Sequence, residues 1–323
     1  MDLDLKYKRI LFELDKYSRQ PYSAIARKVG LLKETTTYRI NKLKEEGIIK
    51  QFSTVISLSN LGLFSHKIYF QLHGLTQEKK KEMINSLESN EKINWIAECI
   101  GTYDLIIAVL CKNIREFDEE KKKILQEYSE YIQNYKVGIM SETHIYKRSY
   151  LLDKKNETES FLIGKPSSIK IDEKDKIILK LISTNSRIET VELAKKLNLN
   201  VKTIISRIKK LEKNNIIQDY RIFLDLDKIS YKYYKIFIYA NKLNEENINR
   251  FLYFCKANKN MIFLVENVGS WEFEPEFEVK SEDDFYKIIN EIKNNFPQLV
   301  KNIETTRIIK EHKFVYCPVE LIS

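Results

Sequence analysis

The feature of this sequence that most constrains its fold is an internal repeat, in which the stretch beginning at Asp4 matches the stretch beginning at Asp172. The offset is constant at 168 residues, and the alignment runs for about seventy residues without a gap. Chance similarity does not hold one register over so long a stretch, so we expect two copies of one unit of about 150 residues. The identical pairs include Ile10/Ile178, Arg19/Arg187, Ala26/Ala194, Thr35/Thr203, Arg39/Arg207, Leu43/Leu211 and Ile49/Ile217.

The few glycines indicate which turns the two copies share. Of the eight in the chain, Gly30 and Gly47 are each matched by an asparagine in the second copy. Asparagine is the commonest residue after glycine in the left-handed conformation that ends helices, so both copies can keep the same helix ends. Only Gly101 and Gly269 are glycine in both copies, which predicts a turn that tolerates no side chain.

The first third of each copy has the apolar spacing of three short helices. A tight turn separates the second helix from the third, which is the helix-turn-helix signature. Alternating apolar residues follow the third helix and predict a strand or short wing. Asn200 is a good N-cap for the third helix of copy two, whereas its partner Leu32 is not, so the first of these helices is expected to fray or begin later. The predicted helices are 5–16, 22–29 and 33–46, then 173–183, 190–197 and 201–214.

The third helix of each copy is the expected recognition helix for double-stranded DNA. Its outward face carries basic and hydroxyl side chains, which can contact phosphates and base edges. The formal net charge of +9 is compatible with an anionic partner. A merely solvated helix face is the alternative, but the same placement after a tight turn occurs twice. The predicted DNA-contacting residues are Lys33, Thr35, Tyr38, Arg39, Lys42, Lys202, Thr203, Ser206, Arg207 and Lys210.

The remainder of each copy has the order strand, helix, strand, strand, helix, strand, which describes a ferredoxin-like α+β unit. The predicted strands are 67–73, 93–99, 104–111 and 136–146, then 234–240, 261–267, 271–279 and 300–314, and the predicted helices are 77–88, 114–133, 245–257 and 282–295. The expected fold class is therefore α+β, with two tandem copies of a winged helix-turn-helix followed by a ferredoxin-like domain. A polar stretch containing Gly164 and Pro166 separates the copies and is typical of a linker. The predicted domains are 1–52 and 53–150, a linker at 151–168, and then 169–220 and a diverged 221–323.

Several short motifs make the chain resemble the Lrp/AsnC (leucine-responsive regulatory protein/AsnC) family of transcription regulators. They are A-x-x-x-G-L from Ala26, T-x-x-x-R-I-x-x-L from Thr35, E-G-I-I from Glu46 and G-T-Y-D from Gly101. The resemblance implies DNA binding, dimers joined through the sheet faces, and amino acids or related molecules as effectors. It also implies an effector pocket between subunits at the G-x-x-D turn. Carried over to both copies, the expected effector-binding residues are Gly101, Thr102, Tyr103, Asp104, Gly269, Ser270, Trp271 and Glu272.

Copy two departs from the family pattern in the strand that follows this turn. Acidic residues alternate along it from Glu272 to Glu278, where copy one has mostly apolar residues, and Trp271, Phe273 and Phe277 alternate on the opposite face, which the helices are expected to cover. A dry interface containing stacked carboxylates is costly unless each one finds a cation. We therefore expect the second sheet not to pair as the first does, or its acidic face to be neutralised by Lys235 or Arg307. Pro275 is also unexpected in a central strand, and we hypothesise that copy two has lost or changed effector binding.

Other functions are less well supported by the sequence. It contains no dinucleotide-binding, P-loop or nucleophile-elbow motif, so we expect no catalytic residue and no cofactor. The histidines have no carboxylate or thiol at ligand spacing, so no metal site is predicted. Sirohaem decarboxylases resemble the same fold and are one alternative; a sensor that no longer binds DNA is another. No signal peptide or membrane span is expected, so the protein is predicted to be cytoplasmic, as a homo-oligomer or an intramolecular pseudo-dimer.

Overall fold

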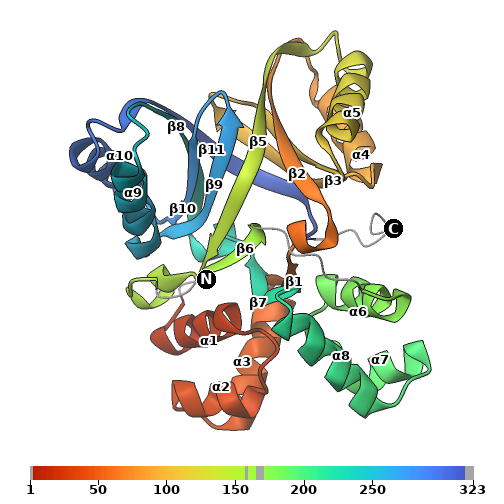
Figure 1. Cartoon of the computed structure of the whole chain (residues 1–323). Helices are drawn as coiled ribbons and strands as arrows, with labels where there is room; N and C mark the ends of the chain where they lie inside the picture. The colour runs from red at the N-terminus through yellow and green to blue at the C-terminus, as the bar shows by residue number, and fades with distance from the viewer. Residues whose placement is uncertain (1–2, 157–158, 165–170, 317–323) are drawn as a thin grey trace.

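The computed structural model describes residues 3–156, 159–164 and 171–316. Two helix-turn-helix units lie side by side beneath a body of paired β-strands, and further helices cover the outer faces of that body (Figure 1). A pseudo-two-fold axis relates the two copies, so each helix-turn-helix unit and each sheet of the first copy has its equivalent in the second. No helix in the described part of the chain is long and apolar enough to span a membrane.

Each helix-turn-helix unit consists of three helices packed around an apolar centre. The helices start where the sequence predicts, because equivalent caps and apolar stripes recur at the 168-residue offset. The expectation that the third helix of copy one begins late is wrong: it starts at Lys33 without a side-chain cap, because Ile40 and Leu43 bury its inner face. The bounds are α1 (Leu5–Lys16), α2 (Tyr22–Val29), α3 (Lys33–Glu45), α6 (Glu173–Thr184), α7 (Thr190–Leu197) and α8 (Val201–Lys213).

The helix ends confirm that asparagine replaces glycine without changing the backbone. Gly30 ends α2 at φ +66°, and Asn198 ends α7 at φ +51°. Gly47 and Asn215 follow α3 and α8 at φ +68° and +53°. All four residues lie in the left-handed region, which asparagine tolerates better than other side chains do.

The two wing strands join the copies. β1 (Ile49–Ile56) pairs antiparallel with β7 (Ile217–Leu224), and Ser53 lies opposite Arg221 at the centre of the pairing. These two residues are related by the same offset of 168, so the pseudo-two-fold axis passes between them. Each strand also packs on the other copy: Thr54 donates a hydrogen bond to the carbonyl of Ile182 in α6. The wings are thus exchanged between the two DNA-binding units.

The two ferredoxin-like sheets join along both edges. Within the sheets the strand orders are β3-β4-β2-β5 and β9-β10-β8-β11. β3 pairs with β11 and β5 pairs with β9, so that eight strands form a closed ring of hydrogen-bonded neighbours. The strands are β2 (Phe64–Leu72), β3 (Ile93–Gly101), β4 (Leu105–Cys111), β5 (Ile132–Tyr146), β8 (Lys232–Ala240), β9 (Met261–Gly269), β10 (Phe273–Val279) and β11 (Val300–Phe314).

Helices cover only the outer faces of this ring (Figure 1). α4 (Gln77–Ser89) and α5 (Ile114–Glu127) pack on the first sheet, while α9 (Glu245–Ala257) and α10 (Glu282–Asn295) pack on the second. The helix predicted at 114–133 is shorter than expected, because a turn at residues 128–131 redirects the chain into β5. The inner faces of the two sheets lie against each other and share a mixed apolar cluster from both copies.

The connection between the copies is more ordered than a plain linker. The polar stretch 151–168 contains β6 (Glu159–Ile163), which adds to the ring as an edge strand on β5. The 3₁₀ turn η2 (Ser149–Leu152) precedes it, and two others, η1 (Ser59–Leu61) and η3 (Asp227–Ile229), follow the wings. Residues 157–158 and 165–168 of the predicted linker lie outside the described residues.

The expectation that the second sheet does not pair like the first is wrong. Its acidic face is turned inward, against the first sheet, and Glu274 is completely buried there. The apolar face of β10, with Phe273 and Phe277, packs under the helices as predicted. Pro275 occupies the central strand at a place where the pairing with β8 is interrupted, so its missing N–H breaks no ladder there.

Candidate nucleic-acid interface and effector turns

The two recognition helices present basic side chains on their outward faces. On α3, Lys33 and Tyr38 are exposed, and Thr35 and Lys42 are half-buried. On α8 the exposed members of the predicted set are Lys202, Ser206 and Lys210, and Thr203 is half-buried beside its capping partner Asn200. Both outward faces therefore carry lysine side chains that are exposed or half-buried, which a surface that contacts phosphates requires.

Arg39 and Arg207 occupy a different position from the other predicted contacts. Arg39 Nη1 lies 2.8 Å from the carboxylate of Asp4, the N-cap of α1, and its guanidinium stacks 4.4 Å from the Tyr7 ring centroid. Arg207 pairs in the same way with Asp172 at 2.8 Å. Each arginine therefore ties a recognition helix to the first helix of its unit. Their contact with DNA stays a prediction.

Symmetric contacts lock the two DNA-binding units together. The Ser18 and Ser186 hydroxyls, which are equivalent in the two copies, hydrogen-bond to each other at 2.7 Å. Arg19 donates to the carbonyl of Ser186, and its counterpart Arg187 donates to the carbonyls of Ser18 and Gln20. Together with the β1–β7 pairing, these contacts fix the separation and orientation of α3 and α8.

The two predicted effector turns are alike in backbone structure. Gly101 has φ +130° and Gly269 has φ +143°, a region that favours glycine. A Cβ at Gly101 would lie 2.7 Å from the carbonyl oxygen of Thr305, so this turn tolerates no side chain, as predicted. The backbone N–H and the hydroxyl of Thr102 both donate to that same carbonyl.

The acids of the two turns perform the same task despite their different lengths. Asp104 accepts a hydrogen bond from the backbone N–H of Leu72 at 2.8 Å. Glu272 accepts one from the N–H of Ala240, the residue equivalent to Leu72 in the second copy, at 2.5 Å. Each acid therefore accepts a hydrogen bond from the last residue of a neighbouring strand, and the change from Asp to Glu preserves this contact.

The aromatic residues of both turns point between the sheets. Tyr103 is 2% exposed and Trp271 is 1% exposed, and their ring centroids are 6.0 Å apart. Tyr69 and Phe237 complete the cluster, with Tyr69 edge-on to the indole at 4.8 Å. Trp271 thus lies on the acidic side of the second sheet, not on the helix-covered side that strict alternation predicted. The exposed backbone at Gly101, Gly269 and Ser270 forms the outer surface of these turns.

Buried cations neutralise the acidic face. Lys235, the expected partner, lies 3.0 Å from Glu274 and also pairs with Glu276, while Lys67 from the other sheet lies 3.0 Å and 3.3 Å from the same two carboxylates. Burial alone would raise the pKa of Glu274, but the two lysines outweigh it and hold the pKa at about 2. Arg307, also expected as a partner, forms no ion pair with this face among the described residues.

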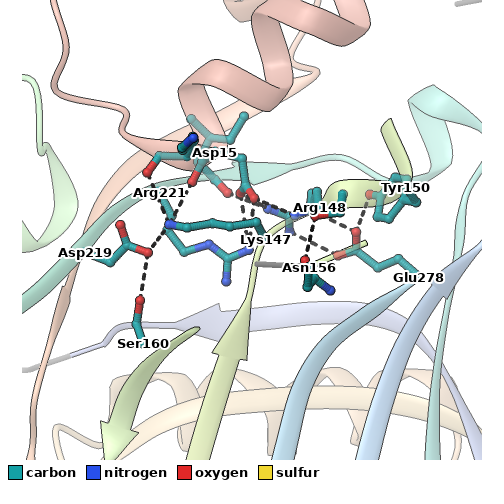
Figure 2. Close-up of polar contacts among 12 residues, drawn as sticks. Asp15, Lys147, Arg148, Tyr150, Asn156, Ser160, Asp219, Arg221 and Glu278 are labelled. Carbon is teal, nitrogen blue, oxygen red and sulfur yellow. Dashed lines mark hydrogen bonds and ion pairs between the residues drawn. The ribbon is translucent and has the colours of Figure 1, made fainter. Parts of the chain in front are cut away.

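Glu278 belongs to a second buried network, which joins the first DNA-binding unit to the second sheet (Figure 2). Arg148 donates from Nε to Glu278 at 2.9 Å and from Nη1 to Asp15 of α1 at 2.7 Å. Arg221 of β7 also pairs with Asp15, at 3.2 Å. Burial would raise the pKa of Asp15, yet the arginines lower it to about 2.

This second network is present on one side of the pseudo-two-fold axis only. The residues equivalent to Asp15, Arg148, Arg221 and Glu278 are Ser183, Tyr316, Ser53 and Leu110, all of which are buried. The sequence reasoning missed the network, because its members are far apart in the chain and each has an uncharged counterpart. A comparison of each charged residue with its equivalent in the other copy would have identified them.

A family profile described as winged helix-turn-helix DNA-binding matches this chain twice, at residues 3–50 and 171–218. Both matches span the three helices and the start of the wing. The chain is therefore a winged helix-turn-helix protein with two DNA-binding units.

Two curated relatives assign the family. The HTH-type transcriptional regulator FL11 of Pyrococcus abyssi is 30% identical over 118 residues, which are 36% of this chain and 77% of the relative. FL11 of Pyrococcus horikoshii is 30% identical over 116 residues, 36% of this chain and 76% of the relative. The chain belongs to the Lrp/AsnC family of DNA-binding transcription regulators.

The solved structure of a siroheme decarboxylase matches the whole tandem arrangement. The siroheme decarboxylase NirDL superposes with a TM-score of 0.63 and 14% sequence identity, covering 96% of this chain and 93% of NirDL. At this level of identity the likeness concerns the fold, two helix-turn-helix units and two ferredoxin-like sheets, and does not extend to the chemistry.

Proposed function

We propose that this chain acts as a single-chain pseudo-dimer that places α3 and α8 in two successive major grooves of one DNA duplex. The observation that carries the proposal is the pseudo-two-fold link between the units, made by β1–β7 and by the Ser18–Ser186 hydrogen bond. Dimeric helix-turn-helix proteins read two half-sites about one helical turn apart. Here the linkage lies within one chain, so the half-site spacing is fixed without assembly of a second copy.

The exposed lysines of the recognition helices are the best candidates for phosphate contacts. Lys202 and Lys210 are exposed on α8, and Lys33 is exposed on α3. Arg39 and Arg207 are already held by carboxylates, so reaching DNA would require them to leave ion pairs. We infer that the lysines supply most of the salt-dependent affinity, and that the arginines mainly position the recognition helices.

The test is a titration of DNA selected from a genomic pool, followed by fluorescence anisotropy at several salt concentrations. Lys202→Ala/Lys210→Ala is expected to weaken binding and to reduce the salt slope by about 0.9 for each phosphate that the variant no longer neutralises. The matched control is Lys293→Ala, at the end of α10 on the outer face of the second sheet. Unchanged affinity in the double variant, or no selectable DNA at all, would contradict the proposal.

We also propose that an amino acid or a similar small molecule binds at the outer surface of the turns at 101–104 and 269–272. Supporting observations are the exposed backbone of both glycines and the family to which the chain belongs. Asp104 and Glu272 hold their turns through equivalent contacts, so both turns keep the same shape. A thermal-shift screen of the twenty amino acids should find a stabilising ligand whose effect Asp104→Asn removes.

A second candidate function is a sirohaem-modifying activity, which the NirDL likeness over 96% of the chain brings forward. The interior between the sheets argues against it. The cavity there has a volume of about 40 Å³, and the buried carboxylate of Glu276 lines it. A large polyanionic tetrapyrrole needs room and unpaired cations. Adding sirohaem and recording its absorbance spectrum tests this alternative: a shift at equimolar protein would favour it over DNA regulation.

A further inference from the structure

A cluster of possible metal ligands lies at the seam where β5 of the first copy meets β9 of the second. It consists of Glu142 and His144 on β5 and Glu266 on β9. Glu142 lies directly opposite Glu266 in the strand pairing, just after a bulge at residue 141. Two of the three ligands therefore come from the first copy and the third comes from the second, so spacing along the sequence does not reveal the complete set.

The distances within the cluster suit a small divalent cation. His144 Nε2 lies 3.0 Å from Glu266 Oε1 and 3.7 Å from Glu142 Oε2, and the three ligand atoms all lie within 4.8 Å of one another. Ligands bound tetrahedrally to Zn²⁺ are about 3.4 Å apart. Modest side-chain movement would therefore bring all three atoms to bonding distance of one ion.

The surroundings of His144 supply a second observation. Its side chain is 9% exposed, and no described residue forms a hydrogen bond to its Nδ1. Glu159 Oε2 on β6 lies 3.9 Å from that atom. Metal-ligating histidines commonly direct their other ring nitrogen to a carboxylate, which fixes the tautomer. Glu159 is placed for this role once Nε2 binds an ion.

The charge at the cluster is not balanced by protein groups. Lys256 pairs with Glu159 at 3.3 Å. Among the described residues, no lysine or arginine forms an ion pair with Glu142 or Glu266. Two carboxylates therefore face one imidazole, and a divalent cation would neutralise both. Glu142 also borders a surface cavity of about 460 Å³, which gives an ion a path from solvent.

The equivalent seam on the other side of the molecule provides an internal comparison. There, His312 on β11 lies 3.1 Å from Glu98 on β3, and both residues sit at the 168-residue offset from the first pair. Lys310 takes the place of Glu142, opposite Glu98, and Lys80 also pairs with Glu98. This second seam has the histidine and one carboxylate but carries two cations, so it cannot hold a metal ion.

We propose that Glu142, His144 and Glu266 form a binding site for one divalent transition-metal ion, such as Zn²⁺, that joins the two copies at the β5–β9 seam. Imidazole and carboxylate ligands suit this class of ion. Three protein ligands leave at least one coordination position for water. The site lies outside both recognition helices, and the inference does not depend on the proposed DNA binding.

The experiment is isothermal titration of the metal-stripped full chain with ZnCl₂, together with a thermal-unfolding scan with and without Zn²⁺. We expect one ion per chain and a higher unfolding temperature with Zn²⁺. His144→Gln should lower the affinity at least about tenfold and abolish the thermal shift, in line with the cost of disturbing a metal site. His312→Gln is the matched control and should bind like the wild type.

Glu142→Gln provides a second test should His144→Gln fail to fold, because Glu142 is half-buried at the edge of the cluster. It should weaken Zn²⁺ binding to a similar degree and leave the fold intact in far-ultraviolet circular dichroism. Absence of Zn²⁺ binding by the wild type would overturn the proposal. So would wild-type affinity in the Glu142 variant, or an equal loss in the His312 control.

Discussion

At the scale of single residues, buried charges decide how the two sheets can meet. Glu274 and Glu276 would oppose burial if they stood alone, since desolvating a carboxylate costs several kcal/mol. Lys67 comes from the first sheet and Lys235 from the second, so each copy contributes a cation to the same pair of acids. The acidic face of β10 can therefore be buried against the first sheet, because that sheet supplies one of the two cations that neutralise it.

Replacing Lys235 by methionine tests this specificity. The variant leaves two buried carboxylates with one cation, so the free energy of unfolding should fall by about 3–5 kcal/mol. Lys232→Met, on the same strand but half-buried beside Glu282, is the control and should change stability by less than about 1 kcal/mol. Denaturant unfolding monitored by tryptophan fluorescence measures both. Equal stability of the two variants would contradict this view of the interior.

The low pKa values of Asp15 and Glu274 predict how stability depends on acid. Each has a pKa of about 2 in the folded protein, below the ordinary carboxyl value near 4. The unfolded chain therefore takes up protons first, and the stabilisation present above pH about 4 is lost as the pH falls towards 2. Unfolding temperatures measured from pH 6 to pH 2 should drop steeply below pH 4. Asp15→Asn should start lower and show a shallower decline, and a decline as steep as that of the wild type would count against the assignment.

At the scale of secondary-structure elements, most of the architecture could be predicted from the repeat. The bounds of α2, α7, α9, α10 and β11 agree with those predicted, because apolar periodicity and capping residues act locally. The strand β6 was not foreseen, since its pairing with β5 depends on the position of that strand in space. Likewise, the side of the sheet that Trp271 occupies depends on the turn before β10, which simple alternation ignores.

The turn at Gly101 offers a test at this scale. Gly101→Ala places a Cβ 2.7 Å from the carbonyl oxygen of Thr305, in a backbone region that disfavours side chains. We expect a loss of about 2–4 kcal/mol in unfolding free energy from the combined clash and strain. Gly74→Ala, where no atom lies within 4 Å of the added Cβ, isolates the cost of positive φ and should be clearly milder. Similar losses in both variants would show that the contact with Thr305 is unimportant.

At the scale of the whole molecule, the duplication forms a dimer-like unit within one chain. The recognition helices could be located from sequence, but their mutual arrangement could not, because it depends on β1 and β7 crossing between the copies. The predicted role of Arg39 and Arg207 illustrates the same limit. A helical wheel places them outward, whereas the structure shows carboxylates of the first helix beside them.

The symmetry of this unit is also incomplete in a way that sequence patterns alone did not reveal. The network of Asp15, Arg148 and Glu278 connects one DNA-binding unit to the opposite sheet, and the other side has an uncharged set of residues in its place. Buried charges therefore connect the DNA-binding unit that contains α3 to the opposite sheet, whereas the unit that contains α8 lacks this connection. The molecule is symmetric where its two DNA-binding units join and asymmetric where the first of them meets the second sheet.

The measurement that most directly tests this account is hydroxyl-radical footprinting of the selected DNA, combined with determination of the number of chains bound. One chain fixes α3 and α8 in a pseudo-two-fold pair, so we predict a single chain protecting two half-sites whose centres are about 10 base pairs apart. Protection of only one half-site per chain, or no protection at any concentration that leaves the protein folded, would contradict the central claim.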